Sequence, residues 1–239
     1  MTLRKAWEEH ARDWLRFART PGHDHFYERF NLPAFLELLP PPGRAALDLG
    51  CGEGRLGKLL VERGYRIVGV DTSPTLAEAA REHHEVLEAD AAALPFEDGA
   101  FDLVYAFMSL HDMDDLEGAV RESGRVLERG GRFCFAVEHP LQKSGRWVDP
   151  DDPESPFVVD RPYLRPRRFE DVRERDGIRM TFVGLDRPLS AYAAALEAAG
   201  LLIEAVREPV PPSAYAAEYP RAAKWGRIPG FLQVRAVKP

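Results

Sequence analysis

The chain has 239 residues, of which 45% are hydrophobic and 30% charged, and its net charge at pH 7 is −7. This length suits one α/β domain with insertions and a sizeable buried core. The acidic balance argues against a nucleic acid partner, because phosphate binding needs clustered Lys and Arg. Two cysteines, Cys51 and Cys134, favour a reducing compartment over a disulfide framework. With no apolar leader and no stretch long enough to span a bilayer, we expect a cytoplasmic protein without a membrane partner.

The first part of the chain is expected to be helical. Residues 3–39 mix apolar and charged residues and are interrupted by Thr20-Pro21-Gly22. Pro40-Pro41-Pro42-Gly43 ends this part, because proline cannot continue a helix. We therefore predict a helical cap over residues 1–42, followed by the main domain over residues 43–239.

The main domain begins with alternating strand and helix patterns. Short apolar runs predict strands at 45–49, 66–70, 85–89, 101–107 and 132–137. Amphipathic segments predict helices at 54–63, 74–83 and 114–128, the last ended by Gly130-Gly131. Such alternation indicates a parallel sheet with right-handed crossovers.

The pattern changes after the fifth strand. Residues 140–185 form a polar, Pro-rich insertion, in which Asp176-Gly177 separates two strand-like runs and predicts a hairpin. Long irregular segments in compact domains are often functional, so we expect a lid here. Beyond it we expect a helix at 189–199 and a strand at 201–207. An irregular stretch at 209–227 and a final antiparallel edge strand at 231–238 would follow.

A glycine-rich segment joins the first strand to the first helix of the main domain. Gly50, Gly52 and Gly54 let the backbone turn sharply and approach a ligand. The following helix presents its N-terminus to the same space. Asp71 ends the second strand, where an acid can bind ribose hydroxyls. This arrangement predicts a cofactor that contains a nucleoside.

Two residues disfavour a dinucleotide. Arg55 follows the glycines, whereas a pyrophosphate-binding loop ends G-x-x-G or G-x-x-A. Asp48 precedes the first glycine by two positions, and its anion would repel a pyrophosphate but suit an ammonium and a sulfonium. An NAD(P)-dependent oxidoreductase is therefore the weaker alternative.

Four motifs in order give the sequence a family resemblance. They are Leu47-Asp48-Leu49-Gly50-Cys51-Gly52-Glu53-Gly54, Gly69-Val70-Asp71-Thr72-Ser73-Pro74, Ala89-Asp90-Ala91 with Phe101-Asp102-Leu103-Val104, and Arg125 to Gly131. Over roughly residues 44–139 the chain resembles the class I S-adenosylmethionine-dependent methyltransferases, and is similar to the quinone-biosynthesis branch. The resemblance implies a Rossmann-like fold with a seven-stranded, mostly parallel sheet and an antiparallel edge strand. It also implies S-adenosylmethionine as cofactor and methyl transfer to an O or N atom of a small-molecule acceptor.

The resemblance also implies roles for individual residues. Gly50 and Gly52 would line the methionine part of the cofactor, with Asp48 near its amino group. Asp71 would bind the ribose hydroxyls, with Thr72 alongside. The adenine would meet Asp90 and the backbone of Ala91, and the sulfonium side would meet Ala106 and Phe107.

Other candidates come from position in the chain. Cys51 lies in the glycine loop, where we expect a small buried side chain rather than a nucleophile. The N-terminal residues Trp14, Arg19, His23 and Tyr27 would either cover the cofactor or pack on the sheet.

His139 and then His111 are the candidates for a general base. Each follows the carboxyl end of an inner strand, and an unperturbed imidazole has a pKa near 6.5. A structural role for either histidine is the alternative. Asp112, Asp114 and Asp115 are expected to cap a helix rather than bind a metal.

Two questions stay open at this level. A non-catalytic protein that binds S-adenosylmethionine or S-adenosylhomocysteine would keep the same cofactor loop. The predicted hairpin could fold back as a lid or pair with a second copy, so the chain is expected to be a monomer or a homodimer.

Overall fold

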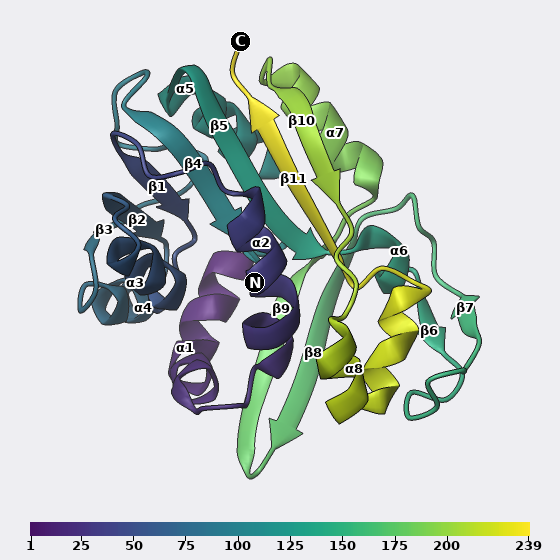
Figure 1. Ribbon diagram of the computed structural model, residues 1–239. Coiled ribbons are helices and arrows are strands. Elements are labelled where there is room, and N and C mark those ends of the chain that lie inside the picture. Colours follow the sequence, from purple (N-terminus) through teal and green to yellow (C-terminus); the bar gives the residue numbers. More distant parts are fainter.

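The computed structural model describes residues 1–239 as a seven-stranded sheet with helices on both faces and a cap at the carboxyl ends of the parallel strands (Figure 1). The strand order is β10-β11-β5-β4-β1-β2-β3. The strands are β1 Ala46–Leu49, β2 Ile67–Asp71, β3 Glu85–Glu88, β4 Phe101–Phe107, β5 Leu127–Glu138, β10 Leu202–Arg207 and β11 Phe231–Val237.

The sheet has the predicted composition. Only β11 runs antiparallel to its neighbours, β5 and β10, so the Rossmann-like, mostly parallel sheet is confirmed. The position of the antiparallel strand differs from the prediction by one place. Because β11 pairs on both sides, it lies inside the sheet, and β10 forms the edge.

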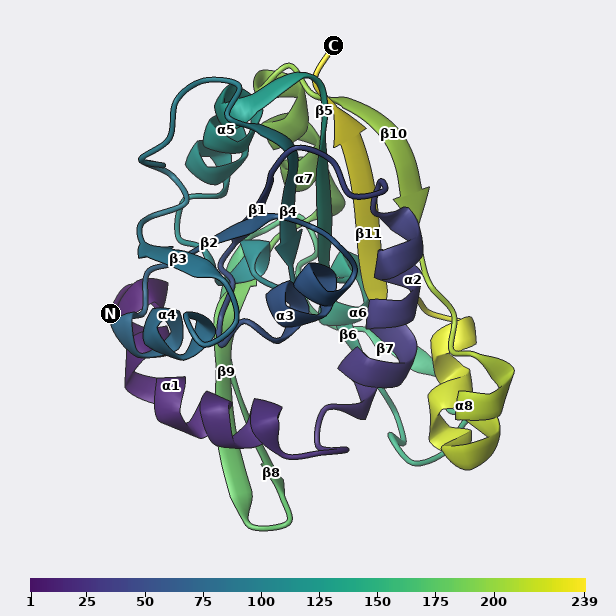
Figure 2. The ribbon, with the colours of Figure 1, turned by 60° about the vertical axis from the view of Figure 1, so that its left-hand side comes forward.

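Helices cover both faces of the sheet. On one face pack α5 (Leu116–Val126) and α7 (Leu189–Ala198), and on the other α2 (Leu32–Leu38) and α3 (Arg55–Glu62). Successive side chains of a strand point to opposite faces, so Ala106 of β4 joins the α5 side and Tyr105 the α2 side. The short helix α4 (Pro74–Ala80) lies beside β2 and β3 (Figure 2).

The cap combines segments that are far apart in sequence. Helix α1 (Leu3–Arg19) packs along the long hairpin formed by β8 (Arg167–Arg175) and β9 (Ile178–Asp186), as Figures 1 and 2 both show. Positive φ angles at Asp176 and Gly177 form its turn, which confirms the predicted hairpin. A π-helical turn, η1 (Tyr27–Asn31), leads from the cap into α2.

Several segments expected to be irregular have regular structure. Within 140–185 the chain also forms α6 (Pro140–Lys143), β6 (Gly145–Trp147) and β7 (Phe157–Val159). The stretch after β10 folds into α8 (Ser213–Glu218) and the 3₁₀ segment η3 (Pro220–Gly226). A further 3₁₀ turn, η2 (Leu110–Asp112), follows β4.

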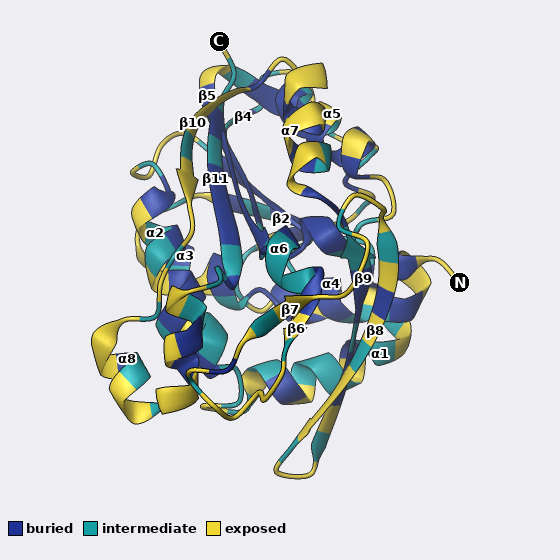
Figure 3. Cartoon of the chain, turned by 90° about the vertical axis from the view of Figure 1, so that its right-hand side faces the viewer, coloured by how far each residue is buried: buried dark blue, intermediate teal, exposed yellow.

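Burial divides the molecule sharply (Figure 3). The central strands are buried, whereas the tip of the hairpin and much of α8 are exposed. β5 starts at Leu127 rather than at 132, because Gly130, with φ of +80°, is absorbed into the strand instead of ending it. None of the helices combines the length and apolarity that crossing a bilayer requires.

Candidate cofactor and acceptor site

A cavity of about 900 Å³ lies between the carboxyl edge of the sheet and the cap. Its lining includes the loop after β1, the ends of β2, β4 and β5, and residues of α1, η1, the hairpin, α8 and η3. Open α/β sheets bind ligands at this edge, where strand order reverses on the two sides of β1.

The loop after β1 needs glycine for two reasons. Gly50, Gly52 and Gly54 have φ angles of +65°, +57° and +83°, which other residues rarely adopt. A Cβ on Gly50 would also lie 2.7 Å from Cβ of Ser109. The Ser109 hydroxyl donates a 2.6 Å hydrogen bond to the carbonyl of Leu49, which fixes this contact. The loop therefore exposes backbone to the cavity.

Asp71 ties this loop to the end of β2. One carboxylate oxygen accepts a 2.9 Å hydrogen bond from the Gly52 amide, and the other accepts one of 2.9 Å from the Ser73 amide. Burial raises its pKa to about 6. Asp71 and the neighbouring Thr72 line the cavity. Because each carboxylate oxygen can accept more than one hydrogen bond, Asp71 keeps acceptor capacity for a pair of hydroxyls.

Asp48 is a buried carboxylate without a cationic partner. Its side chain lines the cavity and accepts a 2.9 Å hydrogen bond from the hydroxyl of Tyr105. Burial, with the nearby charges of Asp71 and Glu53, raises its pKa to about 8. A ligand amine would favour the charged form of such a group, since an uncompensated buried charge is costly. The donor set therefore fits an ammonium.

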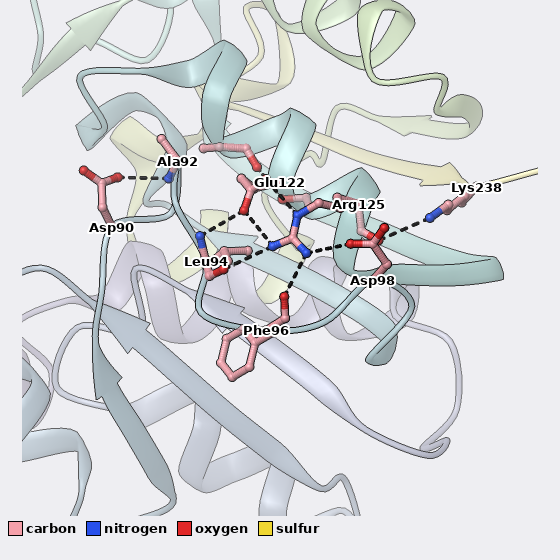
Figure 4. Close-up of polar contacts among 10 residues, drawn as sticks. Asp90, Ala92, Leu94, Phe96, Asp98, Glu122, Arg125 and Lys238 are labelled. Carbon is pink, nitrogen blue, oxygen red and sulfur yellow. Dashed lines mark hydrogen bonds and ion pairs between the residues drawn. The ribbon is translucent and has the colours of Figure 1, made fainter.

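Hydrogen bonds from α5 fix the loop that carries Asp90 and Ala91 (Figure 4). The carboxylate of Asp90 accepts a 2.9 Å hydrogen bond from the Ala92 amide, and both Asp90 and Ala91 line the cavity. Arg125 of α5 donates to the carbonyls of Leu94 and Phe96 further along this loop. Glu122 pairs with Arg125 and also accepts from the Leu94 amide.

Arg55 links the cap to the glycine loop. Its guanidinium pairs with Glu53 of the loop at 3.1 Å and with Asp24 of the cap at 2.8 Å. It also lies 3.5 Å from the ring centre of Tyr27. The indole of Trp14, in α1, donates to Glu53. In the sequence, Arg55 only disfavours a dinucleotide, and no motif predicts this network.

A second polar group lies where β4 and β5 end. Glu138, the last residue of β5, pairs with Lys143 at 2.9 Å, and both line the cavity with His111 and Asp112. Burial, helped by Lys143 and Arg187, lowers the pKa of His111 to about 4. Burial opposes the charge on Glu138, but Lys143 and His111 outweigh it and lower the pKa of Glu138. At neutral pH the group therefore holds a neutral imidazole beside a carboxylate.

Comparison with known proteins agrees with this geometry. Residues 47–135 match the family described as "Methyltransferase domain". Demethylmenaquinone methyltransferase of Thermus thermophilus is 40% identical over 133 residues, which cover 52% of this chain and 59% of that protein. A malonyl-[acyl-carrier protein] O-methyltransferase of Legionella pneumophila is 33% identical over 148 residues, covering 58% and 50%. The chain thus spans between half and three fifths of these relatives.

A solved structure extends the likeness beyond the matched segment. The crystal structure of an S-adenosylmethionine-dependent methyltransferase from Mesorhizobium loti has a TM-score of 0.70 and 29% identity, covering 86% of this chain and 96% of that one. Residues 47–135 thus match the methyltransferase domain family, and the fold of the whole chain is similar to that of an S-adenosylmethionine-dependent methyltransferase. The glycine loop, Asp48 and Asp71 have the chemistry that S-adenosylmethionine needs.

Most of the predicted cofactor residues of the methyltransferase domain line the cavity, but two do not. The side chain of Ala106 points into the core under α5, because the alternation of β4 places Phe107, not Ala106, on the cavity side. Arg19 is exposed and pairs with Glu82 at 3.2 Å, away from the cavity. Cys51 lines the cavity, and burial raises its thiol pKa well above the usual value, which makes it a poor nucleophile.

His139 is not placed to act as a base in the cavity. Its Nδ1 accepts a 3.1 Å hydrogen bond from the Leu141 amide and so caps α6. Its Nε2 lies 2.9 Å from a carboxylate oxygen of Glu208, and the residue does not line the cavity. The alternation of β5 explains this, because Glu138 faces the cavity and the next residue must face away. Of the two histidines, only His111 lines the cavity.

Proposed function

We propose that this protein transfers the methyl group of S-adenosylmethionine to an O or N atom of a small-molecule acceptor. One observation carries the proposal: a single cavity joins the glycine loop and Asp71 to His111 and Glu138. Its volume, about 900 Å³, is near the upper limit for ligand pockets, which leaves room for an acceptor beside the cofactor.

The chain's own residues would position the reactants. S-adenosylmethionine, when bound, supplies an electrophilic methyl group on a sulfonium. Asp71 would hold the ribose hydroxyls and Asp48 the amino group, which fixes the orientation of the cofactor. Trp14 and Tyr27, joined to the loop through Arg55, would exclude water from above. The part of the predicted cap before α2, residues 1–31, would form the lid together with the insertion 140–185. Holding the two reactants close together and correctly oriented is the main contribution of such a site to the reaction rate.

His111 is the proposed base for a hydroxyl acceptor. Its low pKa keeps the ring neutral at pH 7, and its Nδ1 has no hydrogen-bond partner in the protein. The acceptor O–H proton would move to the imidazole of His111, and the anion of Glu138 would stabilise the resulting imidazolium. An amine acceptor would need only the same positioning.

Calorimetric titration with S-adenosylmethionine and S-adenosylhomocysteine tests the cofactor assignment. We expect micromolar binding that Asp71→Ala reduces at least about tenfold, because a carboxylate hydrogen bond to the ligand is lost. Arg19→Ala is the matched control, since Arg19 lies outside the cavity. Failure of the folded protein to bind either compound, together with binding of NADH, would favour the oxidoreductase alternative.

Release of S-adenosylhomocysteine in the presence of phenols and amines tests turnover. A catalyst should form it in amounts well above the enzyme concentration with at least one acceptor. Tight cofactor binding without turnover on any acceptor class would favour the non-catalytic binding protein instead.

A further inference from the structure

One end of the cavity has a continuous aromatic wall, which we call the aromatic lobe. Trp147 and Trp225 have ring centres 5.7 Å apart, and Phe26 follows at 6.3 Å from Trp225. His25 lies 5.0 Å from Phe26 and stacks on Tyr219 at 4.7 Å. All five line the cavity. They come from the segment before η1, from β6 and from the α8–η3 region, which Figures 1 and 2 place at the other end of the cap from α3 and α4.

Two cations of this lobe have no carboxylate partner. Lys224 of η3 is 5% exposed, and its ammonium donates to the carbonyl of Pro150 and lies 5.4 Å from the Trp147 ring centre. Arg175, at the end of β8, donates to the carbonyl of His23 and to Nε2 of His25. Both line the cavity. Neither forms an ion pair, whereas most cationic side chains around them do.

The paired neighbours make the contrast clear. Arg146 pairs with Asp160, Arg173 with Asp171 and Arg221 with Asp151, all of them within about 3 Å. The charges of Lys224 and Arg175 are therefore left for something else in the cavity. Lys224 is buried, whereas Arg175 is partly exposed. A cation that is buried without a counterion is costly, so a bound anion would be favoured beside Lys224.

His25 fixes the direction of Arg175 without adding charge. Arginine can only donate, so Nε2 of His25 must accept, and the proton of a neutral ring then lies on Nδ1. Nδ1 in turn contacts the hydroxyl of Tyr215. Burial and the charge of Arg175 lower the pKa of His25, in agreement with a neutral ring at pH 7. The guanidinium is thus held in place by an uncharged partner.

We propose that the aromatic lobe binds a planar aromatic or conjugated acceptor that carries a carboxylate, with Lys224 and Arg175 pairing with that anion. The aromatic wall would pack against the planar body of the molecule, as aromatic rings do in ligand sites. The other end of the acceptor would extend toward His111 in the same cavity. This inference deepens the proposed methyl transfer and rests on it.

Three probes test whether the site needs an anion and whether that anion is a carboxylate: trans-cinnamate, its methyl ester and phenyl phosphate. Each is titrated calorimetrically into the protein saturated with S-adenosylhomocysteine, so that the cofactor part of the cavity is filled. We expect cinnamate to bind about tenfold or more tightly than the uncharged ester, because a charged hydrogen bond to the ligand is worth about that factor. Tighter binding of phenyl phosphate than of cinnamate would overturn the assignment of a carboxylate in favour of a phosphate.

Lys224→Gln and Arg227→Gln form a matched pair of variants. Both remove one cation near Trp147, since the Arg227 guanidinium also lies 5.4 Å from that ring, but Arg227 does not line the cavity. We expect Lys224→Gln to weaken cinnamate binding about tenfold while leaving ester and S-adenosylhomocysteine binding unchanged, and Arg227→Gln to leave all three unchanged. Arg175→Gln provides the same test independently if Lys224→Gln does not fold.

The failures of the two proposals are distinguishable. Loss of S-adenosylhomocysteine binding by the unmodified protein would defeat the proposed function itself. If cofactor binding is normal, three results would defeat only the carboxylate site. They are equal affinity for acid and ester, no binding of any probe, and equal effects of the Lys224 and Arg227 variants.

Discussion

Tyr105 and Asp48 face each other across the parallel strands β4 and β1, and the Tyr105 hydroxyl donates a 2.9 Å hydrogen bond to the Asp48 carboxylate. This is the only hydrogen bond that the protein gives the side chain of Asp48, and burial raises the pKa of Asp48 to about 8. The unliganded protein therefore favours the protonated form of Asp48, and a cationic ligand would favour the charged form.

This arrangement predicts opposite effects on stability and binding for Asp48→Asn. A carboxyl whose pKa is raised from 3.8 to about 8 on folding stabilises the protein when protonated, and this contribution is lost as pH rises from about 4 through 8. Without cofactor, the variant should nearly match the parent near pH 4 and exceed it in free energy of unfolding by on the order of 5 kcal/mol at pH 8, the free energy to which a rise in pKa from 3.8 to about 8 corresponds. Urea unfolding at several pH values measures this.

Cofactor affinity should change in the other direction. The same variant loses the anion that would face the ligand amine, so S-adenosylhomocysteine should bind at least about tenfold more weakly at pH 8. A variant that is less stable than the parent at pH 8, or that binds the cofactor normally, would contradict this account of Asp48.

The Arg55 network predicts that cap and loop are coupled. Arg55→Met should leave Glu53 and Asp24 without their shared cation and cost about 3 kcal/mol in free energy of unfolding. It should also weaken cofactor binding, because Trp14 and Tyr27 lose their link to the loop. Arg19→Ala removes a surface pair and should cost less than about 1 kcal/mol. Equal losses in both variants would show that the network has no special role.

The two histidines predict different phenotypes. His111→Gln should lower kcat for a hydroxyl acceptor by about 10² or more while cofactor binding stays normal. With the pKa of His111 near 4, the kcat/KM of the parent should fall only below about pH 5. His139→Ala should instead remove the cap of α6, costing about 1 kcal/mol with a small effect on kcat. A pH profile with a midpoint near 6.5 would argue against His111.

Two glycines with similar φ angles provide a backbone test. Gly50→Ala combines a strained φ of +65° with a Cβ placed 2.7 Å from Ser109, so the loop must shift and cofactor binding should be lost. Gly177→Ala, at φ of +75° in the hairpin turn, meets nothing within 4 Å. It should cost about 1 kcal/mol and leave cofactor binding intact. Thermal unfolding and calorimetry of both variants measure the difference.

Most residues of the proposed cofactor half of the site could be predicted from short sequence motifs. The positions of Gly50, Gly52 and Asp71 could be predicted because loop, strand end and helix start are adjacent in sequence and their chemistry is tied to that spacing. The alternation of a strand is also readable, so Ala106 and Phe107 had to face opposite sides. Which of the two faces the cavity depends on the sheet's orientation to its helices, which a single strand does not encode.

The proposed acceptor half was much harder to predict. Lys224 and Arg175 line the same cavity only because η3 and β8 fold against it, although the two residues are distant in the chain. The segment after β10 is rich in Pro and Ala and was expected to be irregular, yet aromatic contacts with Phe26 and Phe30 hold α8 and η3 in place. Such tertiary contacts override local propensity.

The cavity is thus lined partly by the segment that matches the family and partly by segments that lie outside the match. The family match begins at residue 47 and stops at residue 135, just before Glu138, so it includes the cofactor loop and excludes the cap, the hairpin and the aromatic lobe. Substitutions in the excluded segments would change the lining of the cavity without changing the cofactor loop. Under the proposed function, the matched segment holds the methyl donor together with His111, and the segments outside it shape the rest of the acceptor pocket, so directed redesign of acceptor choice can begin in those segments.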